Sequence, residues 1–150
     1  MIKIICVGKI KEKYLNDLIN DYKTRISKYH KIEIIELKDN DIISESDEIL
    51  KTIKSSDYNI LLDLDGTTID SVGLSRTIEE IFNSSYGTIS FIIGGSNGVD
   101  NRVKTSVDMR LSFSNLTFPH GLFRAILLEQ IYRGFKIINN ETYHKWGKYG

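Results

Sequence analysis

The chain has 150 residues, 41% of them apolar, and its 20 lysines and arginines are balanced by 20 acidic residues. These values are typical of one globular domain with a substantial core, and the zero net charge excludes a generally basic nucleic-acid-binding protein, although a local basic patch could still serve. The single cysteine excludes an internal disulfide framework, and no segment reads as a signal peptide or bilayer span, so a cytoplasmic protein is expected.

The first half of the chain alternates predicted strands and helices. Strands are predicted over Ile2–Val7, Ile32–Leu37 and Tyr58–Leu64, the last closed by a turn at Asp65-Gly66. Between the first two, apolar residues recur on one helical face from Lys11 to Tyr29: Tyr14, Leu15, Leu18, Ile19, Tyr22, Ile26 and Tyr29. A polar stretch, Lys38–Asp47, is expected to form a loop, and a shorter helix is expected over Asp47–Lys54.

The second half continues the alternation. A helix is predicted over Leu74–Phe82, a strand buried on both faces over Thr88–Ile93, and a short helical segment near Asn101–Val107. A fifth strand over Arg110–Phe113 precedes a long helix from about Pro119 to Ile138. The sequence therefore predicts one α/β domain spanning residues 1–150, with a parallel sheet flanked by helices.

A glycine-rich turn, Gly94-Gly95-Ser96-Asn97-Gly98, follows the fourth predicted strand directly. It is not a dinucleotide fingerprint, because Ile93 stands where the first glycine should be, and no Lys-Ser/Thr pair follows to make a phosphate loop. Two interpretations remain at this point: a tight turn that needs positive φ, or a loop whose backbone approaches a ligand closely.

An acidic turn, Asp63-Leu64-Asp65-Gly66-Thr67, supports a rival interpretation. It is similar to the first motif of haloacid-dehalogenase-type phosphatases, in which the first aspartate is the phosphoryl acceptor and the second an acid/base beside Mg²⁺. However, two strands precede the motif instead of none, and no later strand ends in the paired carboxylates that would complete a metal site. The alternative is an Asp-Gly turn at a strand end.

The last predicted helix is apolar almost all the way round, yet it carries Arg124 within an apolar sector. A buried arginine needs an anionic partner, which could be an internal carboxylate or the anion of a ligand near the helix N-terminus. Glu129 and Arg133 form an i,i+4 pair on another face. After the helix, the tail Thr142–Lys148 mixes aromatic and basic residues, a composition that suits either a frayed end or base stacking and phosphate contacts.

With these residues identified, the chain resembles the ribosomal large-subunit pseudouridine N3-methyltransferases, a family of the knotted SPOUT class. The resemblance covers nearly the whole chain. The matching segments are Val7-Gly8-Lys9, Tyr22-Lys23-x-Arg25, Ile92–Gly98, Leu111–Ser114, Thr117–His120, Glu129–Arg133 and Tyr143-His144-Lys145. It implies a C-terminal trefoil knot, which general folding rules make rare and which no periodicity could indicate.

The resemblance also implies a bound S-adenosylmethionine, held by three loops. In this chain the matching residues are Leu62, Gly94 and the run Phe113, Ser114, Asn115, Leu116, Thr117 and Phe118. Their chemistry agrees, since the apolar members can enclose adenine and the methionine chain while backbone groups meet the adenine and ribose edges. The chain departs from the usual family turn at Asp63–Thr67, which commonly has lysine after the glycine, and it extends past Lys145 as WGKYG.

The implied reaction is methylation of N3 of a pseudouridine in large-subunit (23S) rRNA on the assembled ribosome, by a homodimer whose active sites are each completed by the neighbour's C-terminal tail. His144 is the expected base or its positioner, and Tyr143 is expected to pack on the target base. Arg124, Arg133 and Lys145 are the expected phosphate contacts, and no metal is expected. Besides the phosphatase, a non-catalytic ribosome-associated protein remains an alternative at this point.

Overall fold

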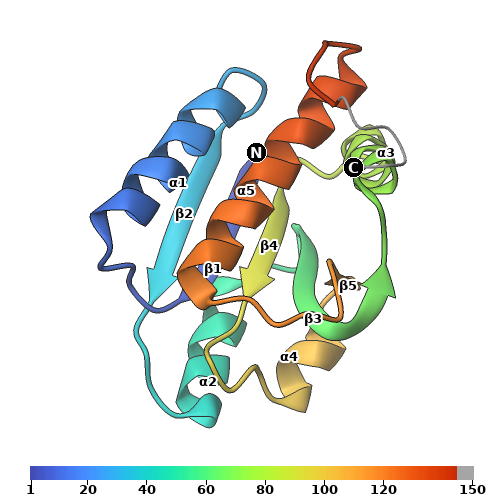
Figure 1. Ribbon diagram of the computed structural model, residues 1–150. Helices are drawn as coiled ribbons and strands as arrows, with labels where there is room; N and C mark the ends of the chain where they lie inside the picture. The colour runs from blue at the N-terminus through green and yellow to red at the C-terminus, as the bar shows by residue number, and fades with distance from the viewer. Residues whose placement is uncertain (145–150) are drawn as a thin grey trace.

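The computed structural model describes residues 1–144 and contains one five-stranded parallel sheet (Figure 1). Its strands are β1 (Ile2–Val7), β2 (Ile32–Leu37), β3 (Tyr58–Thr68), β4 (Ile89–Ile93) and β5 (Met109–Ser112). They lie side by side in the order β2-β1-β4-β3-β5, and every neighbouring pair is parallel. The predicted α/β class with a parallel sheet is confirmed.

Helices cover both faces of the sheet (Figure 1). They are α1 (Lys13–Ile26), α2 (Ile42–Thr52), α3 (Ser71–Asn83), α4 (Asn101–Ser106) and α5 (His120–Ile138). On one face α5 packs between α1 and α3, whereas α2 and α4 contact each other on the other face. Among residues 1–144, no helix is long and apolar enough to cross a membrane.

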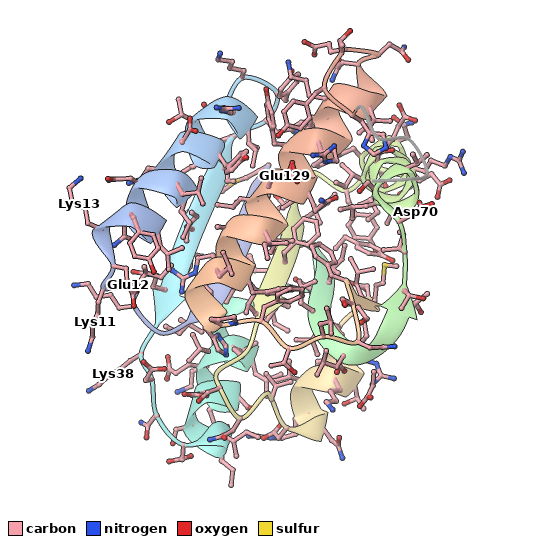
Figure 2. All side chains as sticks on the ribbon, in the orientation of Figure 1. Lys11, Glu12, Lys13, Lys38, Asp70 and Glu129 are labelled. Atoms are coloured by element: carbon pink, nitrogen blue, oxygen red, sulfur yellow. The ribbon has the colours of Figure 1, made fainter. Side chains whose placement is uncertain are left out.

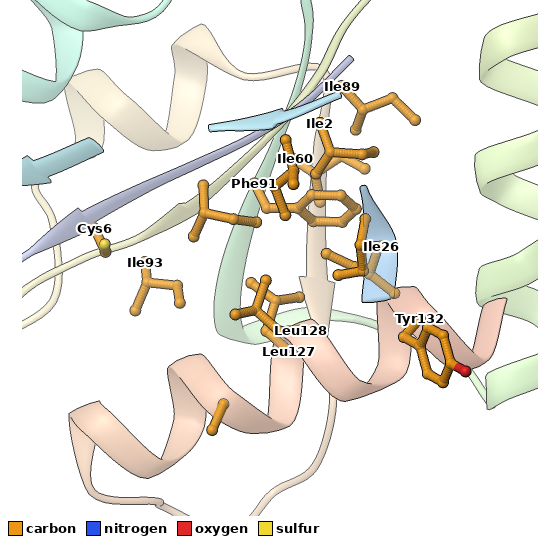
Figure 3. Packing of buried hydrophobic residues seen from close by; sticks show 14 of the residues in the cluster. Ile2, Cys6, Ile26, Ile60, Ile89, Phe91, Ile93, Leu127, Leu128 and Tyr132 are labelled. Carbon is orange, nitrogen blue, oxygen red and sulfur yellow. The ribbon is translucent and has the colours of Figure 1, made fainter. Parts of the chain in front are cut away.

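The central strands β1 and β4 are buried on both faces, which explains why they show no polar alternation. In β1, Ile4 and Cys6 belong to the larger core beneath α1, α3 and α5, while Ile5 and Val7 face the smaller core beneath α2 and α4. Figure 3 shows the larger core, in which Phe91 of β4 packs near Leu127 and Leu128 of α5. The sheet is therefore a rigid base, and the loops at its carboxyl edge are positioned by it.

Two helices begin earlier than their apolar patterns predict, because an aspartate caps each N-terminus. Asp41 accepts a hydrogen bond from the backbone N–H of Ser44, so α2 begins at Ile42 within the stretch expected to be a loop. Asp70 accepts from the N–H of Gly73, so α3 begins at Ser71. The predicted helix starts at Asp47 and Leu74 were wrong for the same reason.

The predicted turn at Asp65-Gly66 was also wrong, because β3 continues to Thr68. The pairing with β5 shifts register between Leu62 and Thr67, both of which face Leu111, so the intervening residues form a bulge. Gly66 permits the bulge to lie close to the backbone of β5, since a Cβ there would lie 2.7 Å from the backbone of Arg110 and Leu111. The bulge places the acidic segment at the edge of the sheet where the loops after β4 and β5 also lie.

The apolar face predicted for the first helix is only partly buried. Leu15, Ile19 and Ile26 enter the core, but Tyr14 is 71% exposed and Leu18 is 38% exposed. The helical period of the apolar residues thus predicted α1 correctly, but the buried face of the helix is narrower than its apolar face.

Cys6 is expected to be chemically inert in the folded protein. Its thiol is fully buried and its Sγ donates to the Ile35 carbonyl oxygen at 3.5 Å, and burial raises the pKa of the thiol to about 11. Reaction with an aromatic disulfide reagent at pH 8 should therefore be at least about 100-fold slower than in denaturant, because little thiolate is present and access is blocked. Rapid labelling of the native protein, followed by absorbance, would show that β1 opens readily.

Candidate active site

A cavity of about 400 Å³ lies at the carboxyl edge of the sheet, where β3, β4 and β5 end. Ligand sites in open α/β sheets form at this edge, and the volume falls in the usual range of roughly 300–1,000 Å³ for small-molecule sites. Seven of the eight residues expected to hold the cofactor line it, and only the exposed Asn115 does not: the lining seven are Leu62, Gly94, Phe113, Ser114, Leu116, Thr117 and Phe118. The fold thus brings three loops that are distant in sequence to one cavity.

The glycine loop after β4 is closely packed from behind, which explains its small residues. A Cβ on Gly94 would lie 2.7 Å from Val99 Cγ1 and 3.2 Å from the Gly98 carbonyl, and a Cβ on Gly95 would lie within contact distance of the Glu45 carboxylate. Gly98 has φ +79°, where glycine is favoured. The loop therefore requires glycine for close packing within the chain and for a left-handed turn, which confirms the tight turn with positive φ; close approach to a ligand stays a prediction.

Buried polar groups of α2 support the same loop. Glu45 is 5% exposed and accepts from the backbone N–H of Asn40, and Ser46 Oγ accepts from the N–H of Asp100 at 3.1 Å. Arg102 of α4 also pairs with Asp47 of α2 at 2.6 Å. The contacts of Asp100 and Arg102 fix the C-terminal end of the loop to α2 at the cavity wall.

The loop between β5 and α5 forms the apolar side of the cavity. Phe123 of α5 stacks on Phe118 with ring centres 5.9 Å apart and packs against Phe113 at 5.6 Å. Ser114 Oγ accepts from the N–H of Leu116, and the Ser114 carbonyl accepts from Ser112 Oγ. The aromatic ring of Phe123 thus anchors both ends of the loop, and the loop exposes backbone groups and apolar side chains to the cavity together.

The acidic segment that suggested a phosphatase is arranged differently from a metal site. Asp63 faces Arg110 at 3.5 Å and Lys104 at 3.9 Å, and it accepts from the N–H of Asp65. Within residues 1–144 no three His, Cys, Asp or Glu side chains are grouped so that they could hold a metal ion. A phosphoryl-accepting aspartate paired with two cations and lacking Mg²⁺ ligands does not fit that chemistry.

Arg124 is not available to RNA, so its expected phosphate contact was wrong. The side chain is buried, its Nη1 donates to Glu36 and its Nη2 donates to the Gly8 carbonyl oxygen at 3.0 Å. This is the internal salt bridge that the sequence indicated as one of two alternatives for a buried arginine. It links α5 to the ends of β1 and β2, because a buried guanidinium must be paired.

Removing this ion pair is expected to lower stability without altering ligand binding. Arg124→Met should cost about 1–3 kcal/mol of unfolding free energy, since Gly8 loses a buried donor and Glu36 loses its partner. Urea denaturation of Arg124→Met, Glu36→Gln and the double variant would give the coupling energy. Unchanged stability of Arg124→Met together with weaker RNA binding would instead support a phosphate contact by Arg124.

The described part of the tail folds back onto α5 through a polar and aromatic cluster around Glu129, which Figure 2 shows on that helix. Arg133 pairs with Glu129 at 3.1 Å, and the Tyr143 hydroxyl donates to the same carboxylate at 3.0 Å. Arg133 also lies over the Tyr143 ring and donates through Nη1 to His144 Nδ1 at 3.0 Å. Arg133 and Tyr143 are thus engaged with one another, and Lys145 lies outside the described residues.

His144 lines a second cavity, of about 470 Å³, which adjoins the first. The two cavities share Phe113, Ser114 and Phe118 as a common wall. The remaining walls of the second cavity come from the start of α3 and from Ile126 and Gln130 of α5, and Ser71 Oγ donates to the Gln130 side-chain oxygen at 2.6 Å. The expected catalytic histidine therefore lies one loop away from the expected cofactor position.

The residues expected to form the site did not include Glu45, His120 or Phe123. Glu45 lies in the polar stretch that was expected to be a loop, and no local pattern indicates that its carboxylate is buried. His120 and Phe123 line the first cavity from α5. Their spacing in the first turn after Pro119 places them beside the preceding loop, which is the signal that could have identified them.

Comparison with known proteins defines the class. Residues 1–144 match the family model described as "Predicted SPOUT methyltransferase". The crystal structure of the SpoU methyltransferase AviRb from Streptomyces viridochromogenes superposes with a TM-score of 0.50 at 10% identity, over 95% of this chain and 62% of that one. The chain therefore belongs to the SPOUT methyltransferases, and its α/β fold is that of the class.

Sequence relatives narrow this class. The ribosomal RNA large subunit methyltransferase H of Fusobacterium nucleatum subsp. nucleatum is 56% identical over 153 residues, covering 96% of this chain and 99% of the relative. The enzyme of the same name from Caldicellulosiruptor bescii is 46% identical over 155 residues, covering 97% of this chain and 100% of the relative. The chain belongs to the ribosomal RNA large subunit methyltransferase H family.

Proposed function

We propose that this protein methylates N3 of a pseudouridine in large-subunit (23S) rRNA on the assembled ribosome, using S-adenosylmethionine. The observation that carries the proposal is the convergence of the three family loops on one cavity. Family membership argues against the phosphatase, and the glycine loop argues against a non-catalytic relative, because close packing around Gly94 and Gly95 preserves the shape of the pocket. A ribosomal substrate also implies a cytoplasmic protein.

The residues at the cavity fit the proposed cofactor. Leu62, Phe113 and Phe118 provide apolar surface for the adenine ring and the methionine chain. Backbone groups of Gly94 and Ser114 line the same cavity and can meet the polar edges of the adenine and ribose. When bound, S-adenosylmethionine supplies an activated methyl group on a sulfonium. The task of the protein is then to align N3 with that methyl group and to exclude water.

The rRNA contacts must come from surface residues, since Arg124 is buried and Arg133 is engaged in the cluster around Glu129. Lys9 and Lys11 follow β1, and Lys38 follows β2; all three are exposed. Figure 2 shows Lys11 and Lys38 extending into solvent near the carboxyl edge of the sheet. We include these lysines, together with Lys145, as proposed phosphate contacts. Such contacts supply position and affinity without reading the base.

A homodimer is part of the proposal, with each active site completed by the neighbour's C-terminal tail, as the resemblance implies. Exposed apolar side chains on adjacent helices support it: Tyr14 and Leu18 on α1, and Leu122, which is 40% exposed, on α5. Tyr14 and Leu122 border the same cleft. The trefoil knot belongs to the same proposal, and β5 at the sheet edge followed by α5 between α1 and α3 is compatible with it.

The experiment is a methyl-transfer assay with tritiated S-adenosylmethionine on ribosomes from a strain that lacks this modification. Methylation of assembled ribosomes, with the label mapped to N3 of a pseudouridine in 23S rRNA, is the expected result. Free rRNA should be a poor substrate. Calorimetry with S-adenosylhomocysteine measures the affinity of the cofactor pocket separately. Binding of this ligand without methyl transfer to ribosomes would overturn the proposed acceptor and support the proposed cofactor.

Oligomeric state and tail exchange can be tested together by mixing subunits. A Gly94→Val chain should fail in the cofactor pocket, and a chain lacking residues 143–150 should fail at the acceptor side. If tails act on the neighbouring subunit, the mixture recovers activity that neither chain has alone. Sedimentation would show a dimer for each parent. Absence of recovery in a proven mixed dimer would place the tail on its own active site.

A further inference from the structure

The contacts of His144 define which of its nitrogens carries a proton. Arginine has five N–H donors and no acceptor, so the 3.0 Å contact from Arg133 Nη1 requires a lone pair on His144 Nδ1. In the neutral imidazole the proton then lies on Nε2. Protonating Nδ1 as well would set two N–H donors against each other. Nδ1, the nitrogen that could accept a proton, is therefore occupied by Arg133, and the other edge of the ring presents Nε2–H as a donor.

Glu129 holds Arg133 in the orientation that this contact needs. Its carboxylate accepts from Arg133 Nε at 3.2 Å and Nη2 at 3.1 Å, from Gln130 Nε2 at 3.0 Å and from the Tyr143 hydroxyl at 3.0 Å. Glu129 and Arg133 side chains are each about one-fifth exposed. With Nε and Nη2 bound to the carboxylate, Nη1 is left to point at the imidazole.

Tyr143 does not supply an alternative base. Burial, a hydrogen bond with Tyr22 and the neighbouring Glu129 carboxylate raise the pKa of its hydroxyl well above the usual value. The hydroxyl therefore stays protonated, and it donates to Glu129. Its ring packs edge-on against Tyr132 with centres 4.9 Å apart. These contacts assign Tyr143 to holding the tail on α5.

We infer that Glu129 and Arg133 are positioning residues that fix His144 as a hydrogen-bond donor to a carbonyl oxygen of the acceptor base, and that His144 is not its general base. This rests on the proposed methyl transfer. N3 forms its bond to the methyl carbon as the carbon–sulfur bond breaks and its electron pair goes to sulfur. The N3 proton leaves to solvent water. The Nε2–H stabilises the negative charge that deprotonation of N3 spreads onto the neighbouring oxygens.

The donor role is independent of which subunit the tail serves. The cluster of Glu129, Arg133, Tyr143 and His144 is formed entirely within one chain. It presents the Nε2 edge of the ring as a unit, either to the adjoining cavity of its own chain, which His144 lines, or to the neighbouring active site.

Conservative variants separate a donor from a base. The amide nitrogen of glutamine can occupy the position of Nε2, whereas that of asparagine falls near Nδ1. His144→Gln should keep kcat within about tenfold of the wild type, while His144→Asn and His144→Ala should lose about 10²–10³-fold. Binding of S-adenosylhomocysteine and thermal melting report that each variant is folded. Equal loss in all three would overturn the inference and indicate a base.

The positioning role of Glu129 and Arg133 can be tested separately through kcat and KM. Glu129→Gln should lower kcat about tenfold or more and leave KM for ribosomes within about twofold, because the acceptor still binds but the donor is misaligned. A rise in KM with kcat unchanged would instead assign the pair to RNA binding and overturn the inference.

The tautomer can be measured without any substrate. The chain has three histidines, so ¹⁵N spectra of the imidazoles can be assigned by the resonance that disappears in His144→Gln. Protonated Nε2 with unprotonated Nδ1 is expected in the wild type, and tautomer exchange is expected in Arg133→Met. A proton on Nδ1 of the wild type would overturn the inference. Because this measurement needs no transfer, it stays informative even if the proposed acceptor is wrong.

Discussion

Gly94→Val is expected to weaken binding of S-adenosylhomocysteine by about 10–100-fold and to reduce methyl transfer at least as much. A Cβ at Gly94 would lie 2.7 Å from Val99 Cγ1 and 3.2 Å from the Gly98 carbonyl, so the side chain has no room behind the loop. Overpacking of this kind costs about 1–3 kcal/mol, and each 1.4 kcal/mol corresponds to roughly tenfold in affinity. The glycine loop must therefore shift, and because it forms a wall of the cavity, the shift changes the shape of the proposed cofactor site.

The effect should be local, because the loop is fixed to α2 through Ser46 and packs on Glu45 rather than on the main core. Calorimetric titration gives the affinity, and circular dichroism gives the melting temperature. Gly87→Ala is the matched control, since a Cβ there meets nothing within 4 Å. Unchanged affinity in a folded Gly94→Val protein would mean that the cofactor does not use this loop.

The fold was largely predictable because its strands and longer helices are set by local patterns. Continuous apolar runs gave β1 and β4, the period of about 3.6 residues gave α1 and α3, and a long apolar run after Pro119 gave α5. The errors fall where a single polar contact overrides the pattern. Asp41 and Asp70 begin their helices earlier, and the bulge at Gly66 depends on the strand beside it, which no local pattern describes.

The loops that meet at the cavity were predictable, whereas the partners of the charged side chains were less so. Resemblance to a family identified Leu62, Gly94 and Phe113–Phe118, and the sheet brings nearly all of them to one cavity. Whether Arg124 meets a ligand or a carboxylate depends on Glu36, which is 88 residues away in sequence and adjacent only after folding. The same limit applies to Arg133, whose partners include a histidine beyond the end of its helix.

Removal of residues 143–150 is expected to reduce methyl transfer more than about 100-fold while changing affinity for S-adenosylhomocysteine less than about threefold. Neither Tyr143 nor His144 lines the first cavity, so the cofactor site should survive. Loss of Tyr143 also uncovers Tyr132 and frees Glu129, which should cost about 1–2 kcal/mol of stability and lower the melting temperature by several degrees.

A shorter deletion, of residues 146–150 only, is the matched control for this prediction. The resemblance ends near Lys145, so this deletion removes the extension WGKYG and leaves the family segment Tyr143-His144-Lys145 intact. It should retain methyl transfer, measured with the same tritium assay on ribosomes. If the longer deletion kept its activity, Tyr143 and His144 would have no part in the reaction. If both deletions lost activity equally, the essential group would lie within Trp146–Gly150.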